Sequence, residues 1–578
     1  MRVVVVDKKK CTAGKGCDYV CMKFCPINRD EKDCIIKGKE GKISIIEENC
    51  IGCGICVKKC PFDAIKVVNL PKELEKKELY SYGLNCFRLF NLIIPVKNQI
   101  TGLVGVNGIG KSTCLNILSG QIVPNFGEFN SPASGQKVIE YFKGSEGQMY
   151  FENLYAKGVE TSYKPQYIER IPKAFGGTVK ELLKSFSEKI DEIAKELEIY
   201  HLFDRKLDEI SGGELQRVAI AASLVKESQL LFIDEPSSYL DIKQRLKISN
   251  AIRKIGLLKD SCVVVEHDLV MLDYLADLGN IIYGKSGAYG IVSNQLSIRE
   301  AINTYLYGYI KEDNMRFRDS EIKFDVKAPV ISVSRFPLIS WGEVSKNLGT
   351  FKLKINPGSL MRNEIIGILG ENGIGKTTFA KILSGVIKPD SGIIDSSIKI
   401  SYKPQYISVE EDNIVRVYLK TCSNSLIEKL DLSHLLSRKV SELSGGELQR
   451  VAIAECLSRE ADVYLLDEPS AHLDVEQRLN VSNIIRDIVK KKEASCFVID
   501  HDILFMDYLS DKLMIFLGKP GVNGETYGPM QMREGMNKFL KELNITFRRD
   551  KDTKRPRANK LDSQLDSEQK NSGEYYYQ

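Results

Sequence analysis

The alternation of apolar and polar positions predicts a chain of parallel β-strands and helices. Apolar strands within ITGLVGVNG and EIIGILGENG each lead into a glycine-rich loop and a helix, and further apolar strands follow within LLFID and VYLLD. Strands that alternate with helices and end in loops are typical of an α/β fold with a parallel sheet. The apolar run at residues 3–6 predicts one more strand at the N-terminus.

A long internal repeat indicates that this α/β unit is duplicated. SGGELQRVAIA occurs at 211–221 and again at 444–454. GVNGIGKST returns as GENGIGKTT, YKPQY returns unchanged, and LLFIDEPSSYLD returns as VYLLDEPSAHLD, all in the same order. Because the order is preserved over whole domains, the pattern indicates a domain duplication rather than a short-period solenoid.

The first copy carries an insertion. Lys111 and Gln166 lie 26 residues further apart in the sequence than Lys376 and Gln405. The inserted SGQKVIEYFKGSEGQMYFENLYAKG has apolar residues at helical spacing on both sides of GSEG, which predicts a helix–loop–helix at about 130–160. A surface elaboration without function is the alternative.

The segments that follow the two copies also echo each other. NMRFRDSEI in the first and ITFRRDKDTKRPR in the second each carry an aromatic residue followed by arginine. The closing SQLDSEQKNSGEYYYQ is polar, and we expect it to be mobile.

Composition narrows the class of protein. The chain lacks both the roughly 18 consecutive apolar residues of a membrane span and the apolar core of a signal peptide, so we expect a cytoplasmic protein without a membrane partner. Its 82 basic and 77 acidic residues give a net charge of +5. Residues 1–79 alone carry 17 basic and 12 acidic residues, which weakly indicates a polyanionic partner for this part.

Nine of the 15 cysteines fall between positions 11 and 60, and in a reducing compartment this indicates metal binding. CIGCGICVKKCP matches the ferredoxin run for a [4Fe–4S] cluster, and an earlier, looser run also ends in Cys-Pro. Because the cysteine before proline ligates the other cluster in two-cluster ferredoxins, we expect two sets of ligands. The sets are Cys11, Cys17, Cys21 and Cys60, and Cys50, Cys53, Cys56 and Cys25. Zinc is the rival metal, and Cys34 is assigned to neither set.

Two P-loops predict two ATP sites. The glycines turn backbone N–H groups toward phosphate, the lysine supplies positive charge, and the hydroxyl and the later aspartate serve Mg²⁺. The residues expected around ATP are Asn107, Gly108, Gly110, Lys111, Ser112, Thr113 and Asp234, and Asn372, Gly373, Gly375, Lys376, Thr377, Thr378 and Asp467. The residues expected to act on the attacking water or the γ-phosphate are Glu235, His267 and Gln166, and Glu468, His501 and Gln405.

SGGELQR between a P-loop and a DEPS strand resembles the signature of ABC-type ATPases. The resemblance implies that two nucleotide domains pair head to tail, each signature closing over the ATP of the other domain. Ser444, Gly445, Gly446 and Glu447 would then cover ATP on Lys111, while Ser211, Gly212, Gly213 and Glu214 would cover ATP on Lys376. Tyr82, with Phe87 behind it, would contact the first adenine; for the second, Phe336 and Phe351 remain alternatives. Asp500 and His472 depart from the usual Glu and Tyr.

The ferredoxin-like and ABC motifs together resemble the iron–sulfur ABC ATPases of ribosome recycling, a family also called RNase L inhibitor. The resemblance extends over essentially the whole chain. The closing segment NKLDSQLDSEQKNSG is similar to the eukaryotic branch of this family. The resemblance implies an ATPase that splits ribosomes after termination or stalling, as ATP-driven closure moves the iron–sulfur domain, and that stays on the small subunit until hydrolysis. It also implies a monomer that contacts ribosomal RNA through the hinges and the helix–loop–helix. A release factor or its surveillance homologue would be a partner, and initiation factors are further candidates.

We therefore expect an α/β chain with two ABC-type P-loop domains in tandem after an α+β ferredoxin-like domain. The expected boundaries are 1–75 for the ferredoxin-like domain, 76–290 for the first nucleotide domain, 291–330 for hinge 1, 331–520 for the second nucleotide domain, and 521–578 for hinge 2 and the tail. An ABC importer subunit, a DNA-repair ATPase and a redox enzyme are the rival functions. The first would not explain the cysteines, the second would need a coiled coil or zinc fingers, and the third would need a further redox centre.

Overall fold

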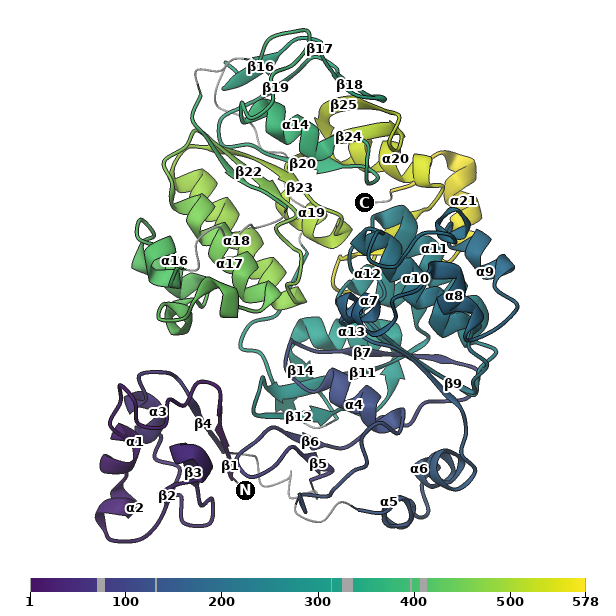
Figure 1. The fold of residues 1–578 in the computed structure, drawn as a ribbon. Helices are drawn as coiled ribbons and strands as arrows, with labels where there is room; N and C mark the ends of the chain where they lie inside the picture. Colours follow the sequence, from purple (N-terminus) through teal and green to yellow (C-terminus); the bar gives the residue numbers. More distant parts are fainter. Residues whose placement is uncertain are drawn as a thin grey trace. The chain divides into compact units, whose positions relative to one another are not determined.

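A computed structural model describes residues 2–69, 78–129, 133–312, 314–324, 336–394, 398–405 and 413–576 (Figure 1). The chain forms two compact units. The first unit comprises 1–236, 251–267 and 275–321, and the second comprises 237–250, 268–274 and 322–578. No helix in the described part of the chain combines the length and the apolar character that crossing a bilayer requires.

The N-terminal part of the first unit is a small α+β fold. Strand β1 (Arg2–Val6) pairs antiparallel with β4 (Ile65–Asn69), and β2 (Ile35–Lys37) pairs antiparallel with β3 (Ile43–Ile45). Three short helices accompany these strands: α1 (Val20–Lys23), α2 (Pro26–Arg29) and α3 (Ile55–Lys59). The valines of β1 are buried, so this expected strand forms part of the domain core.

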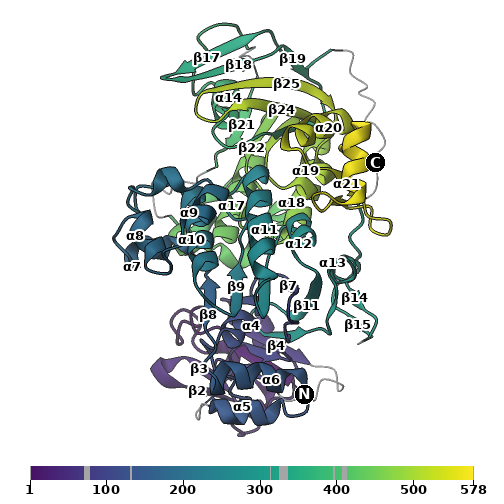
Figure 2. The ribbon, with the colours of Figure 1, turned by 90° about the vertical axis from the view of Figure 1, so that its right-hand side faces the viewer.

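A nine-stranded sheet makes up most of the first unit, in the order β5-β6-β12-β11-β7-β10-β9-β8, with β13 on β11. The pairs β7–β10, β10–β9, β9–β8 and β7–β11 are parallel. Its strands are β5 (Tyr80–Ser81), β6 (Arg88–Phe90), β7 (Ile100–Val104), β8 (Thr161–Lys164), β9 (Leu230–Asp234), β10 (Ser261–Val265), β11 (Leu278–Lys285), β12 (Tyr289–Val292) and β13 (Leu296–Ser297). Figure 2 shows this sheet from a second side.

The helices between residues 111 and 307 follow in chain order. They are α4 (Lys111–Leu118), α5 (Gly135–Tyr141), α6 (Glu146–Phe151), α7 (Ile171–Ala174), α8 (Val179–Lys184), α9 (Asp191–Glu196), α10 (Gly212–Val225), α11 (Ile242–Gly256), α12 (Leu269–Leu275) and α13 (Ile298–Tyr307). The first half of α11 and nearly all of α12 belong to the second unit. The strands β7, β9 and β10 are buried along their whole length, which explains why they are continuous apolar runs rather than alternating ones.

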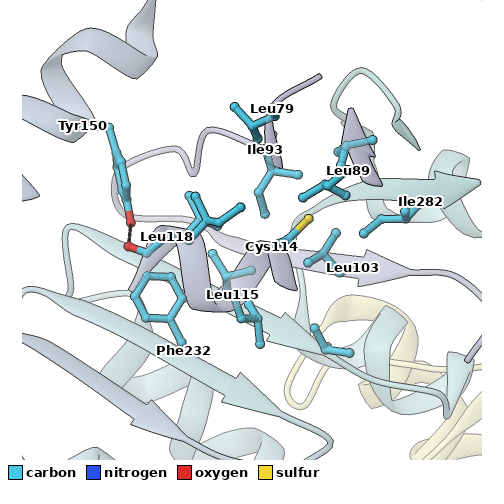
Figure 3. Packing of buried hydrophobic residues seen from close by; sticks show 14 of the residues in the cluster. Leu79, Leu89, Ile93, Leu103, Cys114, Leu115, Leu118, Tyr150, Phe232 and Ile282 are labelled. Atoms are coloured by element: carbon cyan, nitrogen blue, oxygen red, sulfur yellow. Dashed lines mark hydrogen bonds between the residues drawn. The ribbon is translucent and has the colours of Figure 1, made fainter. Parts of the chain in front are cut away.

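The expected helix–loop–helix segment contains α5 and α6, followed by a π-helical turn at Glu152–Ala156. These helices pack on the domain core, because Val138 and Phe151 are fully buried and the hydroxyl of Tyr150 donates to the carbonyl of Leu118 (2.7 Å; Figure 3). The side chain of Met149, in contrast, is 66% exposed. The insertion therefore has one face fixed to the domain and another turned to solvent.

An eight-stranded sheet repeats this arrangement in the second unit, in the order β17-β18-β25-β24-β20-β23-β22-β21. Its strands are β17 (Val344–Leu348), β18 (Phe351–Ile355), β20 (Ile365–Leu369), β21 (Ile400–Lys403), β22 (Val463–Asp467), β23 (Ser495–Ile499), β24 (Lys512–Lys519) and β25 (Asn523–Gln531). A separate pair is formed by β16 (Ile339–Trp341) and β19 (Gly358–Leu360). The helices are α14 (Lys376–Leu383), α15 (Val415–Tyr418), α16 (Asn424–Lys429), α17 (Gly445–Ser458), α18 (Val475–Lys491), α19 (Ile503–Leu509) and α20 (Met532–Leu543).

Each aromatic–arginine segment forms a small hairpin. In the first, β14 (Tyr309–Ile310) pairs with β15 (Met315–Arg316); in the second, β26 (Phe547–Arg549) pairs with β27 (Pro556–Ala558). Arg549 makes a bidentate contact with the carboxylate of Asp507, with both nitrogen–oxygen distances at 2.8 Å. The second hairpin is thereby attached to helix α19.

The expectation of a mobile C-terminal tail was wrong. Residues Gln564–Ser572 form helix α21, whose first N–H groups are capped by Ser563, and Tyr576 is fully buried. The hydroxyl of Tyr576 donates to Asp507 and accepts from Arg549, and the N–H of Phe547 donates to the carbonyl of Tyr575 (2.7 Å). A polar composition did not reveal that one tyrosine near the end attaches the whole segment.

We expect Tyr576→Ala to lower the free energy of unfolding of the second unit by about 3 kcal/mol, because it leaves a cavity and removes a partner of a buried carboxylate. The single tryptophan of the chain, Trp341, is buried in this unit, so its fluorescence during denaturant titration measures that transition. Tyr575→Ala is the matched control, because its contribution to β26 comes from the backbone. Equal effects of the two substitutions would contradict the anchoring role.

Candidate functional site

In the first unit, three chemically important segments meet at the carboxyl edge of the sheet. The P-loop follows β7, Asp234 ends β9, and His267 follows β10, which lies between these two strands. A pocket of about 240 Å³ opens at this edge. It is lined by Tyr82, Phe87, Asn107, Gly108, Gly110, Lys111, Ser112, Thr113, Gln166, Asp234, Glu235 and Gly287.

The P-loop backbone is shaped by glycine and by its own lysine. Gly110 has φ +109°, and a Cβ there would lie 2.7 Å from the ring of Phe87, so only glycine fits. The ammonium of Lys111 donates to the carbonyls of Gly105 and Val106, both at 2.9 Å, and the hydroxyl of Ser112 donates to Asp234 at 2.8 Å. The charge and the hydroxyl expected for phosphate and Mg²⁺ are thus held at one place.

The second unit repeats this geometry. Lys376 donates to the carbonyls of Gly370 (2.8 Å) and Glu371 (2.6 Å), and the hydroxyl of Thr377 donates to Asp467 (2.9 Å). Phe351 stands against Gly375 as Phe87 stands against Gly110. Phe336, the other aromatic considered for this site, has a 79% exposed side chain.

Both glutamates that follow these aspartates have left-handed backbones. The φ angles are +49° at Glu235 and +48° at Glu468, a conformation that costs an ordinary residue about 1–2 kcal/mol. Each carboxylate accepts a hydrogen bond from the side-chain amide of the glutamine in YKPQY. Gln166 donates to Glu235 and Gln405 donates to Glu468, both at 2.7 Å. The left-handed turn therefore directs each carboxylate toward the P-loop of its own domain.

The electrostatics of the two acidic pairs differ. Burial, together with the neighbouring Glu235, raises the pKa of Asp234. Burial alone would also raise the pKa of Glu235, but His267, Lys111 and Lys164 outweigh it and lower this pKa. In the second pair, burial and then Asp467 raise the pKa of Glu468, and no histidine offsets them.

The two histidines are buried beside these glutamates. Nε2 lies 3.3 Å from the carboxylate of Glu235 in His267 and 3.7 Å from that of Glu468 in His501. Within the described residues, Nε2 of His267 and both ring nitrogens of His501 have no partner in hydrogen-bond geometry. Burial lowers the pKa of His501 well below its usual value, so its ring is neutral near pH 7. Buried donors without a partner fit a site that an anionic ligand completes.

The unusual Asp500 before His501 is accommodated locally. Its carboxylate accepts from the N–H (3.0 Å) and the hydroxyl (2.7 Å) of Ser470. The shorter side chain therefore ties the strand β23 to the Asp–Glu turn of the same site.

The two signature serines begin the long helices α10 and α17. Each forms a capping box: the hydroxyl of Ser211 accepts from the N–H of Glu214, whose carboxylate accepts from the N–H of Ser211, and Ser444 and Glu447 do the same. Ser211, Gly212, Ser444 and Gly445 are exposed. In the second unit, the backbone of the unusual His472 approaches Gly446 so closely that a Cβ there would lie 2.8 Å from its carbonyl. Exposed helix N-termini with small residues are suited to contact an anion.

The cysteines of the N-terminal domain form two groups, and none of those that the structure describes is joined in a disulfide. Burial raises the pKa of Cys21 to about 12, with added contributions from Cys60, Cys17 and Cys11. Burial raises the pKa of Cys56 to about 11, with contributions from Cys50, Cys53 and Cys25. The structure thus brings together the same two sets of four thiols that the Cys-Pro pattern indicates, a donor set that fits two [4Fe–4S] clusters.

Cys34 lies beside the second of these sets. Its side chain is 1% exposed, and after burial the thiols of Cys25 and Cys50 contribute most to raising its pKa, to about 12. In the described residues, no three His, Cys, Asp or Glu side chains are arranged around a single metal ion.

The cysteine-rich domain is hydrogen-bonded to the loop that carries Tyr82. Asn85 is buried there, its carbonyl accepts from the N–H of Val6 (2.9 Å), and its side-chain oxygen accepts from the N–H of Ile45 (2.7 Å). The carboxylate of Glu47 accepts from Arg88 at 2.8 Å. Asn85, Glu47 and Arg88 thus form a seam between the cysteine-rich domain and the loop that lines the nucleotide pocket.

A second connection reaches the P-loop itself. Lys66 on β4 donates to the carbonyl of Ser286 (2.8 Å), and the hydroxyl of Ser286 donates to the carbonyl of Asn107 (2.6 Å). Ser286 and Gly287 were not expected at this site, although GKSG at 284–287 returns as GKPG at 518–521. The buried Lys164 and Gln216 and their counterparts Lys403 and Gln449 were not expected either. These four residues lie inside YKPQY and SGGELQR, so the exact repeat was the available signal.

Two P-loop sites, each with its own signature helix, on a chain that begins with a cysteine-rich α+β domain define an ABC-type ATPase with an iron–sulfur domain. Residues 93–238 and 353–471 match the family described as "ABC transporter", and residues 43–66 match "4Fe-4S binding domain". Its cofactors are 4Fe–4S clusters, ATP and Mg²⁺, and it hydrolyses ATP.

Relatives of the whole chain are known from archaea and eukaryotes. An uncharacterised ABC transporter ATP-binding protein of Methanocaldococcus jannaschii is 51% identical, over all of this chain and 98% of its own. Translation initiation factor RLI1 of Saccharomyces cerevisiae is 42% identical, over all of this chain and 98% of its own.

Solved structures are similar in fold as well as in sequence. "Model of ribosome-bound archaeal Pelota and ABCE1" contains a chain with TM-score 0.93 and 47% identity, covering 100% of this chain and 99% of that one. "RNase-L Inhibitor" has TM-score 0.83 and 48% identity, covering 87% of this chain and 100% of that one. The chain belongs to the RNase L inhibitor family of iron–sulfur ABC ATPases.

We expect the purified protein to contain about eight iron atoms per chain, as two [4Fe–4S] clusters require. Cys53→Ala should lose about half of this iron, because it removes one thiolate of the second set. Cys34→Ala is the matched control and should keep all of it. Anaerobic purification followed by iron, sulfide and zinc analysis measures these contents. Zinc in place of iron would contradict the assignment.

Proposed function

We propose that this chain is an ATP-driven ribosome recycling factor, which splits ribosomes into subunits after termination or stalling. The observation that carries the proposal is the attachment of an iron–sulfur domain to the rim of a nucleotide site, through Asn85, Glu47 and Arg88. The printed descriptions of relatives support it, since one is a translation initiation factor and another is a ribosome-bound protein.

The division of labour along the chain is part of this proposal. Residues 1–75 hold the clusters, 76–290 and 331–520 are the two ATPase domains, and 291–330 and 521–578 are the hinges. The ligands of the two clusters are the two sets of four cysteines that the structure brings together. Bound clusters would hold short helices together, because α1, α2 and α3 bury no residue of their own other than Cys21 and Cys56.

The ATPase chemistry follows from groups already in place. Lys111 and Lys376 neutralise phosphate charge, while the Ser112–Asp234 and Thr377–Asp467 pairs would hold Mg²⁺, which supplies further positive charge when bound. Glu235 and Glu468 accept a proton from the attacking water as general bases. Gln166 and Gln405 orient these glutamates, and the histidines donate to the γ-phosphate.

Each ATP is held by both domains when they close. Ser444, Gly445 and Gly446 cover the ATP bound at Lys111, and Ser211, Gly212 and Gly213 cover the ATP bound at Lys376. The exposed N-termini of α10 and α17 support this role, because the backbone N–H groups at the start of a helix attract phosphate. ATP binding therefore favours the closed form, and hydrolysis releases it.

Closure of the two ATPase domains moves the iron–sulfur domain through the seam formed by Asn85, Glu47 and Arg88. Because Asn85 and Glu47 fasten the iron–sulfur domain to the first ATPase domain, that domain moves with it. The movement presses on a release factor or its surveillance homologue and breaks the bridges between ribosomal subunits. The protein then remains on the small subunit, as a monomer in the cytoplasm, until hydrolysis. The hinges and the exposed side of the helix–loop–helix, where Met149 lies, contact ribosomal RNA, and initiation factors are further partners.

We expect the double variant Glu235→Gln, Glu468→Gln to split ribosomes once and then to stay on the small subunit. The amide keeps the shape of the side chain but is a poor base, so hydrolysis should slow by about 100-fold while ATP still binds. Sucrose-gradient sedimentation with ATP measures both splitting and retention. Lys111→Ala should instead weaken ATP binding. Undiminished multiple-turnover hydrolysis by the double variant would show that these glutamates are not the bases.

We expect the seam variant Asn85→Ala, Glu47→Ala to keep its iron and its basal ATPase activity but to split ribosomes more slowly, by about tenfold or more. The physical reason is that closure no longer carries the iron–sulfur domain with it. Glu48→Ala, on an exposed neighbour, is the matched control. Light scattering of ribosomes with release factor and ATP measures the rate. Splitting as fast as that of the unmodified chain would rule out the mechanical coupling.

A further inference from the structure

The left-handed backbone of each catalytic glutamate is held by donors that the ATPase mechanism does not use. Proline follows in both turns and restricts the preceding residue further. The N–H of Glu235 donates to the carbonyl of Val265 at 2.9 Å. Its own carbonyl accepts from the amide of Gln216 (2.8 Å) and the ammonium of Lys164 (3.1 Å).

The second unit has the same arrangement. The N–H of Glu468 donates to the carbonyl of Ile499 (2.7 Å), and its carbonyl accepts from Gln449 (2.6 Å) and Lys403 (3.4 Å). The two lysines reach one residue further back as well, to the carbonyl of Asp234 (2.8 Å) and of Asp467 (2.7 Å). Because the same donors contact the glutamate carbonyl in both copies, these hydrogen bonds are a common feature of the two sites.

These donors are core residues rather than ligand contacts. Lys164 and Lys403 are each 1% exposed, and Gln216 is fully buried. Neither Lys164 nor Gln216 lines the nucleotide pocket. A buried ammonium is tolerated only when hydrogen bonds replace its hydration, and here backbone carbonyls of the Asp–Glu turn provide them. What the donors hold is therefore the turn itself.

The donors also join the turn to two other parts of the first nucleotide domain. Lys164 ends strand β8, two residues before Gln166, whose amide holds the carboxylate of Glu235. Gln216 lies in the signature helix α10, which begins after Ser211. A displacement of α10 would consequently act on the carbonyl of Glu235 directly.

We propose that Gln216 and Lys164, and likewise Gln449 and Lys403, are positioning residues that hold the catalytic glutamate of their own domain in its left-handed turn and make its position depend on the signature helix. This rests on the proposed function, in which the signature of one domain covers the ATP of the other. ATP on Lys376 would contact Ser211, and α10 would transmit that contact to Glu235, which serves the ATP on Lys111. The hydrogen bonds to the carbonyl of Glu235 then connect the two ATP sites.

The test uses the full-length protein with one site silenced. In a Glu468→Gln background, the remaining hydrolysis comes from Glu235. Gln216→Met removes a donor at similar volume, and we expect kcat to fall by about tenfold while KM for ATP stays within about twofold, because ground-state binding is untouched. Lys164→Met should act in the same direction.

Gln449→Met in the same background is the matched control. It removes the equivalent donor from the turn of the silenced site, so the remaining kcat should not change. If Gln449→Met lowered kcat and Gln216→Met did not, the glutamines would act through the ATP that their own signature helix covers, and the proposal would be overturned. Full kcat in both Gln216→Met and Lys164→Met would overturn it too.

Thermal melting and ATP binding separate positioning from loss of fold. Variants that melt at the parental temperature and bind ATP normally, but turn over slowly, support the proposal. If a lower melting temperature or a raised KM for ATP accounted for the whole decrease in turnover, the proposal would be overturned. Failure of the proposed function is recognised separately, because hydrolysis that survives Glu235→Gln with Glu468→Gln would contradict the base assignment itself.

Discussion

The hydrogen bond between the P-loop hydroxyl and the aspartate at the end of a buried strand organises each nucleotide site. It joins Ser112 to Asp234 in the first domain and Thr377 to Asp467 in the second. In each sheet, the strand that leads into the P-loop and the strand that ends in the aspartate are separated by one further strand, and the histidine follows the end of that strand. Because all three strands run parallel, their loops collect at one edge, and the phosphate, metal and water chemistry is confined there.

The same edge of the sheet is hydrogen-bonded to distant parts of the chain. Tyr82 lies in a loop that is hydrogen-bonded to the iron–sulfur domain through Asn85. The P-loop carbonyl of Asn107 accepts a hydrogen bond from Ser286, whose own carbonyl accepts one from Lys66 of the same domain. On the other side of the site, the carbonyl of Glu235 connects the signature helix to the catalytic turn. Short hydrogen-bonded paths of this kind couple binding to movement only where an element has two arrangements, which the proposed closure of the nucleotide domains would supply.

Much of the fold and of the ATP sites could be predicted because glycine-rich loops and buried parallel strands have strict local requirements. Gly110 and Gly375 are needed where a side chain would collide with an aromatic ring, so the same glycine pattern occurs in both copies. The two sets of cysteines follow from the spacing and the prolines in the same way. Lys164 and Gln216 were overlooked because their partners are backbone carbonyls, so the exact repeat marked these residues without indicating what they contact. The buried Tyr576 was overlooked because a polar segment gives no sign of a single anchoring contact.

By itself, the sequence determined the duplication, the order of the domains, the residues of both P-loops and the two groups of cysteines, because each depends on short segments whose chemistry is local. The tertiary structure decided the rest: the left-handed turns at Glu235 and Glu468, the attachment of the iron–sulfur domain at Asn85, and the burial of the C-terminal segment. Each of these depends on groups far apart in the chain, whose meeting is set by the packing of whole elements rather than by any local pattern.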